Sequence, residues 1–314
     1  AGKGPAWSNS LFEDNAEFGY GMLLAQQAIR DGLKAKVEEV AANENATAEV
    51  KAACQEWLDT FSVGATNGVA TDKLVAALEN VDCPTCKDIV KNKDFLAKKS
   101  QWIFGGDGWA YDIGFNGVDH VLASGKDINI MVFNTEVYSN TGGQSSKATP
   151  TGAVAQFAAG GKEVKQKDLA AIAMSYGYVY VAQISMGADM NQTIKAIAEA
   201  EAYPGPSLII AYAPCINHGI KKGMAKAQTE EKLAVQSGYW NLFRFNPAAE
   251  GKKFSLDCKP ATVDYQEFIK GEVRYTSLAL KNPARAEKLF AKAEQNAKDK
   301  YAYLEKLVTL YDEK

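Results

Sequence analysis

Three short segments of the chain carry side chains that could bind a phosphate and a metal ion. The first is Gly106-Asp107-Gly108, which directly follows the apolar run WIF. The second begins at Asn134, after the apolar run INIMVF, and the third is Cys215, after SLIIAYAP. The glycines beside Asp107 let another group approach the backbone closely. Asp107 and Asn134 therefore mark two places where polar ligands follow buried strands.

The oxygen-bearing residues in these segments suit Mg²⁺. Asp107 offers a carboxylate, and Asn134, Thr135 and Asn140 add amide and hydroxyl oxygens. Mg²⁺ takes few protein ligands and completes its octahedron with phosphate and water. A helix that starts near Trp109 would present its positive N-terminus to the phosphate. The economical interpretation is a metal-bridged diphosphate, and a tight turn in which Asp107 caps a helix is the alternative that the tripeptide alone leaves open.

Two better-known phosphate motifs are absent or incomplete. The chain contains no G-x-x-x-x-G-K-[ST] sequence, which excludes a P-loop. A dinucleotide fingerprint needs a third glycine where Tyr111 stands, and its ribose-binding acid should end the next strand, whereas Asp127 begins it.

The elements that position these residues alternate between strand and helix from about residue 100. We predict strands in QWIFGGDG, DINIMVFN, YVYVAQIS and SLIIAYAP, with helices in WAYDIGFNGVDHVLASG, KDLAAIAMSYG and DMNQTIKAIAEAEAY. This alternation predicts an α/β fold with a mostly parallel sheet and helices on both faces. Right-handed crossovers would then place the carboxyl ends of the strands at one edge.

The rest of the chain is expected to be largely helical. Residues 33–97 are rich in Ala, Glu, Lys and Asn, which indicates a helical insertion, and residues 283–314 form an amphipathic tail of one or two helices. Residues 220–282 are mixed and predict little. We treat 1–314 as one domain with these additions. Because it begins with Ala1 rather than Met, it could be a processed chain or a piece of a longer one, and we expect a piece.

Composition excludes some classes of function. The 314 residues are 46% hydrophobic and 23% charged, with a formal net charge of −3. That charge gives no support to nucleic-acid binding. No apolar window reaches the roughly 18 residues of a membrane span. Five cysteines, an odd and small number, favour a reducing compartment, so we expect a cytoplasmic protein.

Other cysteine and histidine residues are weaker candidates for a catalytic or metal-binding role. The pair Cys83 and Cys86 could be redox-active or half of a zinc site, but Cys54 and two distant histidines are the only further ligands on offer. We interpret the pair as non-catalytic. A nucleophilic role for Cys215 beside His218 is disfavoured, and His120 is expected to be a structural helix residue.

The spacing of Asp107 and Asn134, 27 residues apart, resembles the thiamin diphosphate-binding motif, in which Asp, a second side chain and a backbone carbonyl hold Mg²⁺. The usual motif ends in paired Asn, whereas this chain has Asn134-Thr135, which replaces an amide oxygen by a hydroxyl. The longer run GDGWAYDIGFNGVDHVLASGKDINIMVFNTEVYSNTGGQSSKATPTGA resembles the pyruvate:ferredoxin oxidoreductase family, as do GPAWSNSLFEDNAEFGYGM and APCINHG. The chain is similar to the C-terminal thiamin-binding region of that family, and 33–97 matches it weakly.

The resemblance implies roles for individual residues. Mg²⁺ would be held by the side chains of Asp107 and Thr135 and by the main-chain carbonyl of Val137. Asn140 would face the reacting carbon of the cofactor, and Cys215 would be one ligand of a [4Fe–4S] cluster. The diphosphate would be lined by Gly106, Gly108, Trp109, Glu136, Tyr138 and Ser139. Trp109 at a helix start could equally be core, and Tyr138 and Ser139 could merely shape the loop.

The reaction that the resemblance implies is oxidative decarboxylation of pyruvate in a homodimeric enzyme, with coenzyme A taking the acetyl group and ferredoxin or flavodoxin the electrons. A [4Fe–4S] cluster needs four thiolates, and in the family the three ligands other than Cys215 come from outside this segment. The carboxylate that activates thiamin also comes from outside it. Glu136 is at the diphosphate end and cannot take that role. We therefore expect the isolated segment to be inactive. A β-type subunit for another 2-oxoacid and a non-enzymatic phosphate-binding module remain alternatives.

Overall fold

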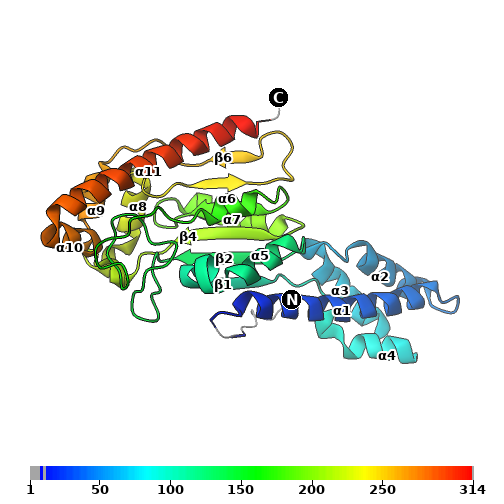
Figure 1. Cartoon of the computed structure of the whole chain (residues 1–314). Helices are drawn as coiled ribbons and strands as arrows, with labels where there is room; N and C mark the ends of the chain where they lie inside the picture. Colours follow the sequence, from blue (N-terminus) through cyan, green and yellow to red (C-terminus); the bar gives the residue numbers. More distant parts are fainter. Residues whose placement is uncertain (1–7, 10–11, 313–314) are drawn as a thin grey trace. The chain divides into compact units, whose positions relative to one another are not determined.

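A computed structural model describes residues 8–9 and 12–312 of the chain, which form two compact units (Figure 1). The first unit comprises Ala1–Asn9 and Phe18–Gln101, and the second comprises Ser10–Glu17 and Trp102–Lys314. Within the sequence runs that resemble the family, residues 4–7, 10 and 11 lie outside the described residues.

The first unit is helical, as predicted for the insertion. It contains most of α1 (Asn15–Ala42), followed by α2 (Ala48–Asp59), α3 (Gly64–Leu78), α4 (Pro84–Lys91) and the short turn η1 (Lys93–Phe95). Thr47 caps α2 by accepting a hydrogen bond from the backbone N–H of Val50. The four helices bury one apolar cluster, which includes Trp57, Leu74 and Ile89.

The second unit is built on a six-stranded sheet of order β1-β2-β4-β3-β5-β6 (Figure 1). Strands β1 (Trp102–Gly106), β2 (Asn129–Asn134), β4 (Ser207–Tyr212) and β3 (Tyr180–Ile184) pair in parallel. These are the four strands that the apolar runs predicted. The near-continuous burial of β2, β3 and β4 is typical of a sheet that is covered on both faces.

Helices cover both faces of this sheet. The chain moves in one direction along the sheet from β1 through α5 (Phe115–Ala123) to β2, and through α6 (Leu169–Met174) to β3. It then reverses through α7 (Met190–Ala202) to β4, so right-handed connections place α7 on the opposite face. Accordingly, Ala196 and Ala200 of α7 pack against Tyr180 and Ile209. The predicted α/β fold with a mostly parallel sheet is confirmed.

Two features differ from the sequence-based expectation. The segment after Gly106 is not one regular helix: Gly108–Ile113 forms a π-helical turn, and α5 starts only at Phe115. The sheet also has two antiparallel strands, β5 (Phe243–Phe245) and β6 (Phe254–Leu256), which were not predicted because three-residue strands carry too little periodicity.

The remaining helical segments follow β4 in the chain, and of them α11 packs against β6. They are the short turns η3 (Ile216–His218) and η4 (Met224–Lys226), then α8 (Ala227–Gln236), α9 (Tyr265–Lys270), α10 (Val273–Lys281) and α11 (Pro283–Leu310). The tail is thus a single 28-residue helix, and it lies alongside β6 (Figure 1). Within the described ranges, no helix is both long and apolar enough to cross a membrane.

Candidate cofactor-binding site

The three predicted polar segments meet at one edge of the sheet. β1 pairs with β2 up to Gly106 and Phe133, and β2 pairs with β4 up to Asn134 and Tyr212. The segments that carry Asp107, Thr135 and Cys215 therefore leave three adjacent parallel strands at their carboxyl ends. In open α/β sheets this edge is where ligands bind.

Asp107 does not cap the helix that follows it. Its side chain makes no capping hydrogen bond, and it is fully buried. Oδ1 accepts hydrogen bonds from the backbone N–H (3.0 Å) and Oγ1 (2.8 Å) of Thr135, and Oδ2 accepts one from Oγ of Ser146 (2.5 Å). Burial raises the pKa of this carboxyl to about 6, while the bonds from Ser146 and Thr135 act in the opposite direction. The alternative of a plain capped turn is thereby excluded.

Oxygen atoms gather around the hydroxyl of Thr135. Its Oγ1 lies 2.8 Å from Oδ1 of Asp107, 3.0 Å from the carbonyl oxygen of Val137 and 3.1 Å from Oγ of Ser139. Two adjacent ligands of an octahedral ion at 2.0–2.1 Å are about 2.8–3.0 Å apart. Oδ1 of Asp107 and the carbonyl oxygen of Val137 each lie at that spacing from Oγ1 of Thr135, which is also the length of an ordinary hydrogen bond. The set has only one carboxylate, and the described part of the chain holds no group of three or more His, Cys, Asp or Glu suited to a metal.

Glu136 gives the loop the shape that brings these oxygens together. It has φ 61°, in the left-handed region that costs a non-glycine residue of order 1–3 kcal/mol. Four hydrogen bonds and one ion pair hold it there. Its N–H donates to Oδ1 of Asn134, its carbonyl accepts from Oγ1 of Thr149, and its carboxylate accepts from Gln166 and Tyr239 and pairs with Arg274. The side chain of Glu136 is buried and turned away from the oxygen cluster. It therefore stabilises the conformation of the loop without contributing an oxygen to the cluster.

A buried charged network supports this loop. Arg274 forms an ion pair with Glu136 (2.8 Å) and donates a hydrogen bond to Glu272 (2.7 Å), and all three side chains are almost fully buried. Burial raises the pKa of Glu272 to about 7, against the attraction of Arg274. Buried ions need such pairing because desolvation costs several kcal/mol for each one.

His218 connects the Thr135 loop with the Cys215 loop. Its Nε2 lies 2.7 Å from the carbonyl oxygen of Thr135, and its Nδ1 accepts a long bond (3.5 Å) from the N–H of Cys215. A carbonyl oxygen only accepts, so Nε2 carries the proton. Burial, followed by the charge of Arg274, lowers the pKa of His218 well below its ordinary value. The ring is therefore neutral, and its 3.6 Å contact with Glu272 is not an ion pair.

Cys215 is buried, and its sulfur faces polar hydrogens. Asn217 donates to Sγ from its backbone N and from Nδ2, both at 3.4 Å. The same Asn217 side chain packs against Gly143, where φ is +81° and an added Cβ would lie 2.9 Å from Oδ1 of Asn217. Gly143 belongs to the loop that carries Asn140, which is exposed. Asn217 thus connects the predicted cluster ligand, Cys215, with the predicted diphosphate loop.

The other predicted diphosphate residues are placed as follows. A Cβ on Gly108 would lie 2.6 Å from the ring of Tyr138, so that glycine is required by the packing of Tyr138. Trp109 is buried against Gly105 and Gly114, and so only its backbone could contact a phosphate. An added Cβ on Gly106 would meet nothing closer than 3.9 Å.

The sequence interpretation missed Ser146 and Thr149, which bond to Asp107 and Glu136, and the more distant Gln166, Tyr239 and Arg274. The hydroxyl-rich run QSSKAT was the one signal available for the first two. His120 lies exposed on α5.

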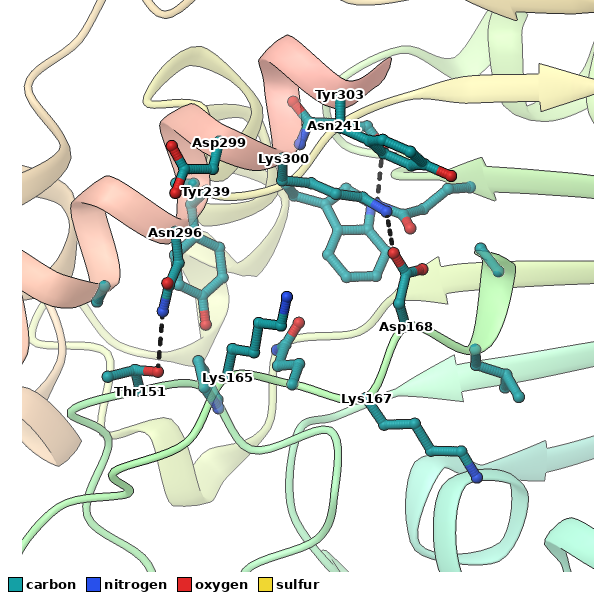
Figure 2. A pocket seen from close by; sticks show the side chains of 18 of the residues that line it. Thr151, Lys165, Lys167, Asp168, Tyr239, Asn241, Asn296, Asp299, Lys300 and Tyr303 are labelled. Atoms are coloured by element: carbon teal, nitrogen blue, oxygen red, sulfur yellow. Dashed lines mark hydrogen bonds and ion pairs between the residues drawn. The ribbon is translucent and has the colours of Figure 1, made fainter. Parts of the chain in front are cut away.

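A separate cavity of about 440 Å³ lies behind this loop (Figure 2). None of the predicted site residues lines it. Its wall includes Gln166 and Tyr239, which bond to Glu136, and Lys300 of α11, which is paired with Asp168 (Figure 2). Lys167 points away from the cavity toward the carbonyl of Tyr111.

Comparison with known proteins agrees with this geometry. Residues 91–211 match the family described as "Thiamine pyrophosphate enzyme, C-terminal TPP binding domain". The chain is 52% identical over 311 residues to a pyruvate-flavodoxin oxidoreductase of Klebsiella pneumoniae, covering 98% of this chain and 26% of that protein. It is 54% identical over 316 residues to a pyruvate:ferredoxin oxidoreductase of Moorella thermoacetica, covering 98% and 27%.

A third relative is a mitochondrial pyruvate dehydrogenase [NADP(+)] of Euglena gracilis, 47% identical over 304 residues, which cover 94% of this chain and 17% of that protein. The chain spans about a quarter of the length of the first two relatives. Over nearly its whole length the chain is therefore similar to about a quarter of the pyruvate:ferredoxin and pyruvate-flavodoxin oxidoreductases, and residues 91–211 match a thiamine pyrophosphate-binding domain, which confirms the resemblance that its long run from Gly106 to Ala153 predicted.

Proposed function

We propose that the edge formed by β1, β2 and β4 binds the diphosphate of thiamin diphosphate through Mg²⁺. Asp107, Thr135 and the carbonyl of Val137 would hold the metal. The single observation that carries this proposal is the spacing of their oxygens, 2.8 Å and 3.0 Å from Oγ1 of Thr135. Backbone N–H groups near Gly106, Gly108 and Trp109, with Tyr138 and Ser139, would line the phosphates, whereas Glu136, predicted as a lining residue, is buried and bonded elsewhere and would only shape the loop.

Bound Mg²⁺ would change the state of Asp107. A buried carboxyl with a raised pKa favours its protonated form, whereas a divalent cation favours the carboxylate. Ser146 and Thr135 donate hydrogen bonds to Asp107, and these bonds would keep its carboxylate oriented before the metal binds. The protein thus prepares an anionic ligand at a position that excludes water.

Cys215 would be one thiolate ligand of a [4Fe–4S] cluster. Two N–H donors on its sulfur are the kind of contact that tunes the potential of such clusters. The other three ligands would come from the remaining domains of the same enzyme. The contact between Gly143 and Asn217 favours a short path between this cluster and the cofactor.

The whole enzyme would convert pyruvate and coenzyme A to acetyl-CoA and CO₂ and pass electrons to ferredoxin or flavodoxin. When bound, thiamin diphosphate supplies a nucleophilic carbon for the 2-oxo group of the substrate. This chain's part is to hold the diphosphate, to keep water away from it, and to aim the Asn140 amide at the substrate carbonyl. The names of the relatives support pyruvate as the substrate, and the Euglena relative indicates that the electron acceptor varies among proteins that share this region.

The test uses the full-length protein, purified anaerobically. We expect thiamin diphosphate, Mg²⁺ and iron on analysis, and reduction of a low-potential dye that depends on both pyruvate and coenzyme A. Activity with another 2-oxoacid but not with pyruvate would favour the alternative of a β-type subunit for a different substrate. Absence of all three cofactors from an otherwise folded protein would overturn the enzyme assignment and favour a phosphate-binding module.

A further inference from the structure

Two thiols outside the cofactor site lie on the first turn of α4. Cys83 is the N-cap residue, Pro84 occupies the first helical position, and Cys86 follows within the same turn. The Sγ of Cys83 accepts a hydrogen bond from the backbone N–H of Cys86 at 3.4 Å. The two side chains therefore share one face of the helix start, where residues three apart are neighbours.

The two sulfurs have opposite surroundings. Cys83 is partly exposed, while Cys86 is 2% exposed and packs in the core with Cys54 and Ile89. The N–H of Cys86 lowers the pKa of the Cys83 thiol, and burial raises the pKa of Cys86. A partly exposed thiol with a lowered pKa at a helix N-terminus, beside a buried thiol, is the arrangement that thiol–disulfide exchange needs.

Two simpler roles do not account for the pair. A zinc site would need four ligands, and the residues that the structure describes include no His/Cys/Asp/Glu cluster of three or more that could hold a metal. A capping role uses only Cys83, and Ser, Thr, Asp or Asn would serve it better than a thiol. Neither role explains why the buried thiol of Cys86 stands beside the cap.

We propose that Cys83 and Cys86 form a reversible dithiol–disulfide site that reacts with small-molecule disulfides. The deprotonated Sγ of Cys83 attacks one sulfur of the disulfide, which forms a mixed disulfide and releases one thiolate. Cys86 then gives its proton to solvent and attacks Sγ of Cys83, which releases the second thiolate. Two protein thiols are oxidised to one disulfide, and one small disulfide is reduced to two thiols. This inference does not depend on the proposed thiamin chemistry.

The first experiment equilibrates the full-length protein anaerobically with glutathione and glutathione disulfide in varied ratios. After acid quenching and alkylation, mass spectrometry of the peptide that contains both cysteines measures the closed fraction. We expect more than half of this peptide to close at excess disulfide and to reopen when reduced glutathione is restored. Cys258, a free and partly buried thiol in the second unit, is the internal control and should remain reduced. A peptide that stays open at every ratio would overturn the proposal.

Two matched variants test the order of attack. Cys86→Ser removes the resolving thiol, so we expect a glutathione adduct to accumulate on Cys83 at least ten times more than in the unchanged protein. Cys83→Ser keeps a good N-cap and should leave Cys86 without an adduct because that thiol is buried. An adduct on Cys86 but not on Cys83 would contradict the assigned roles. The far-ultraviolet circular dichroism of each variant should equal that of the unchanged protein, which separates loss of reactivity from loss of fold.

Discussion

The Oγ1 of Thr135 lies 2.8 Å from Oδ1 of Asp107, although 28 residues separate them in the chain. The contact joins the carboxyl ends of two neighbouring parallel strands, β1 and β2. Because Val137 adds a carbonyl oxygen 3.0 Å from the same hydroxyl, the contact is one edge of an oxygen cluster, and this cluster is where we propose that Mg²⁺ binds.

Replacing Asp107 by Asn should raise the stability of the metal-free protein and weaken the binding of the cofactor. The folded pKa of Asp107 is about 6 and its ordinary value is 3.8. The folded state therefore holds the proton more tightly, and the free energy of unfolding falls as pH rises from about 4 to about 6. Above that range the buried carboxylate costs up to about 3 kcal/mol. Metal-free Asp107→Asn should unfold at a higher temperature than the unchanged protein at pH 8, with a smaller difference at pH 4.5.

The same variant should lose at least about 100-fold in affinity for thiamin diphosphate with Mg²⁺, or about 2.8 kcal/mol. Titration calorimetry of the cofactor-free full-length protein measures this affinity. Unchanged affinity would show that Asp107 is not a metal ligand.

Thr135 offers a matched pair of substitutions. Thr135→Ser keeps the hydroxyl, whereas Thr135→Val keeps the shape and removes the oxygen. We expect Thr135→Val to weaken Mg²⁺-dependent cofactor binding by about 10-fold to 100-fold, and Thr135→Ser to stay within about 3-fold of the unchanged protein. Equal losses in both variants would indicate that the methyl group, and not the hydroxyl, is what the site needs.

Ser146 donates to the second oxygen of Asp107 at 2.5 Å and should act as a positioning residue. Ser146→Ala removes a donor that lowers the pKa of the carboxyl, so the pKa should rise further above 6. Cofactor binding should then weaken more at pH 6 than at pH 8, as measured by the dissociation constant at both values. A loss that is the same at both pH values would point to a packing effect alone.

Arg274 should be essential to the fold of the loop. Arg274→Met leaves the buried carboxylates of Glu136 and Glu272 unpaired, and we expect it to cost about 3–5 kcal/mol. Adding Glu272→Gln removes one of these charges and should recover part of the loss. Thermal unfolding of both variants measures this, and a double variant less stable than Arg274→Met would contradict the pairing.

The sequence was sufficient to predict the elements that repeat a clear pattern. Long apolar runs identified β1 to β4, and their parallel order placed Asp107, Asn134 and Cys215 at one edge. The three-residue strands β5 and β6 were missed because alternation over three residues is indistinguishable from chance.

The residues that bond to Glu136 could not be predicted from the sequence either, and the reason is different. Gln166, Tyr239 and Arg274 are 30, 103 and 138 residues from Glu136, and only the folded chain brings them to its carboxylate. Nothing in the local sequence marks Glu136 as a residue in the left-handed region, since glycine or asparagine is the usual choice there.

The central claim is that Asp107 and Thr135 hold a divalent ion on the diphosphate of thiamin diphosphate. Its most direct test replaces Mg²⁺ by Mn²⁺ in the full-length protein and records electron–nuclear double resonance of ³¹P. We predict phosphorus couplings from the bound diphosphate that disappear in Asp107→Asn and weaken in Thr135→Val. Phosphorus couplings of unchanged size and intensity in Asp107→Asn would contradict the account.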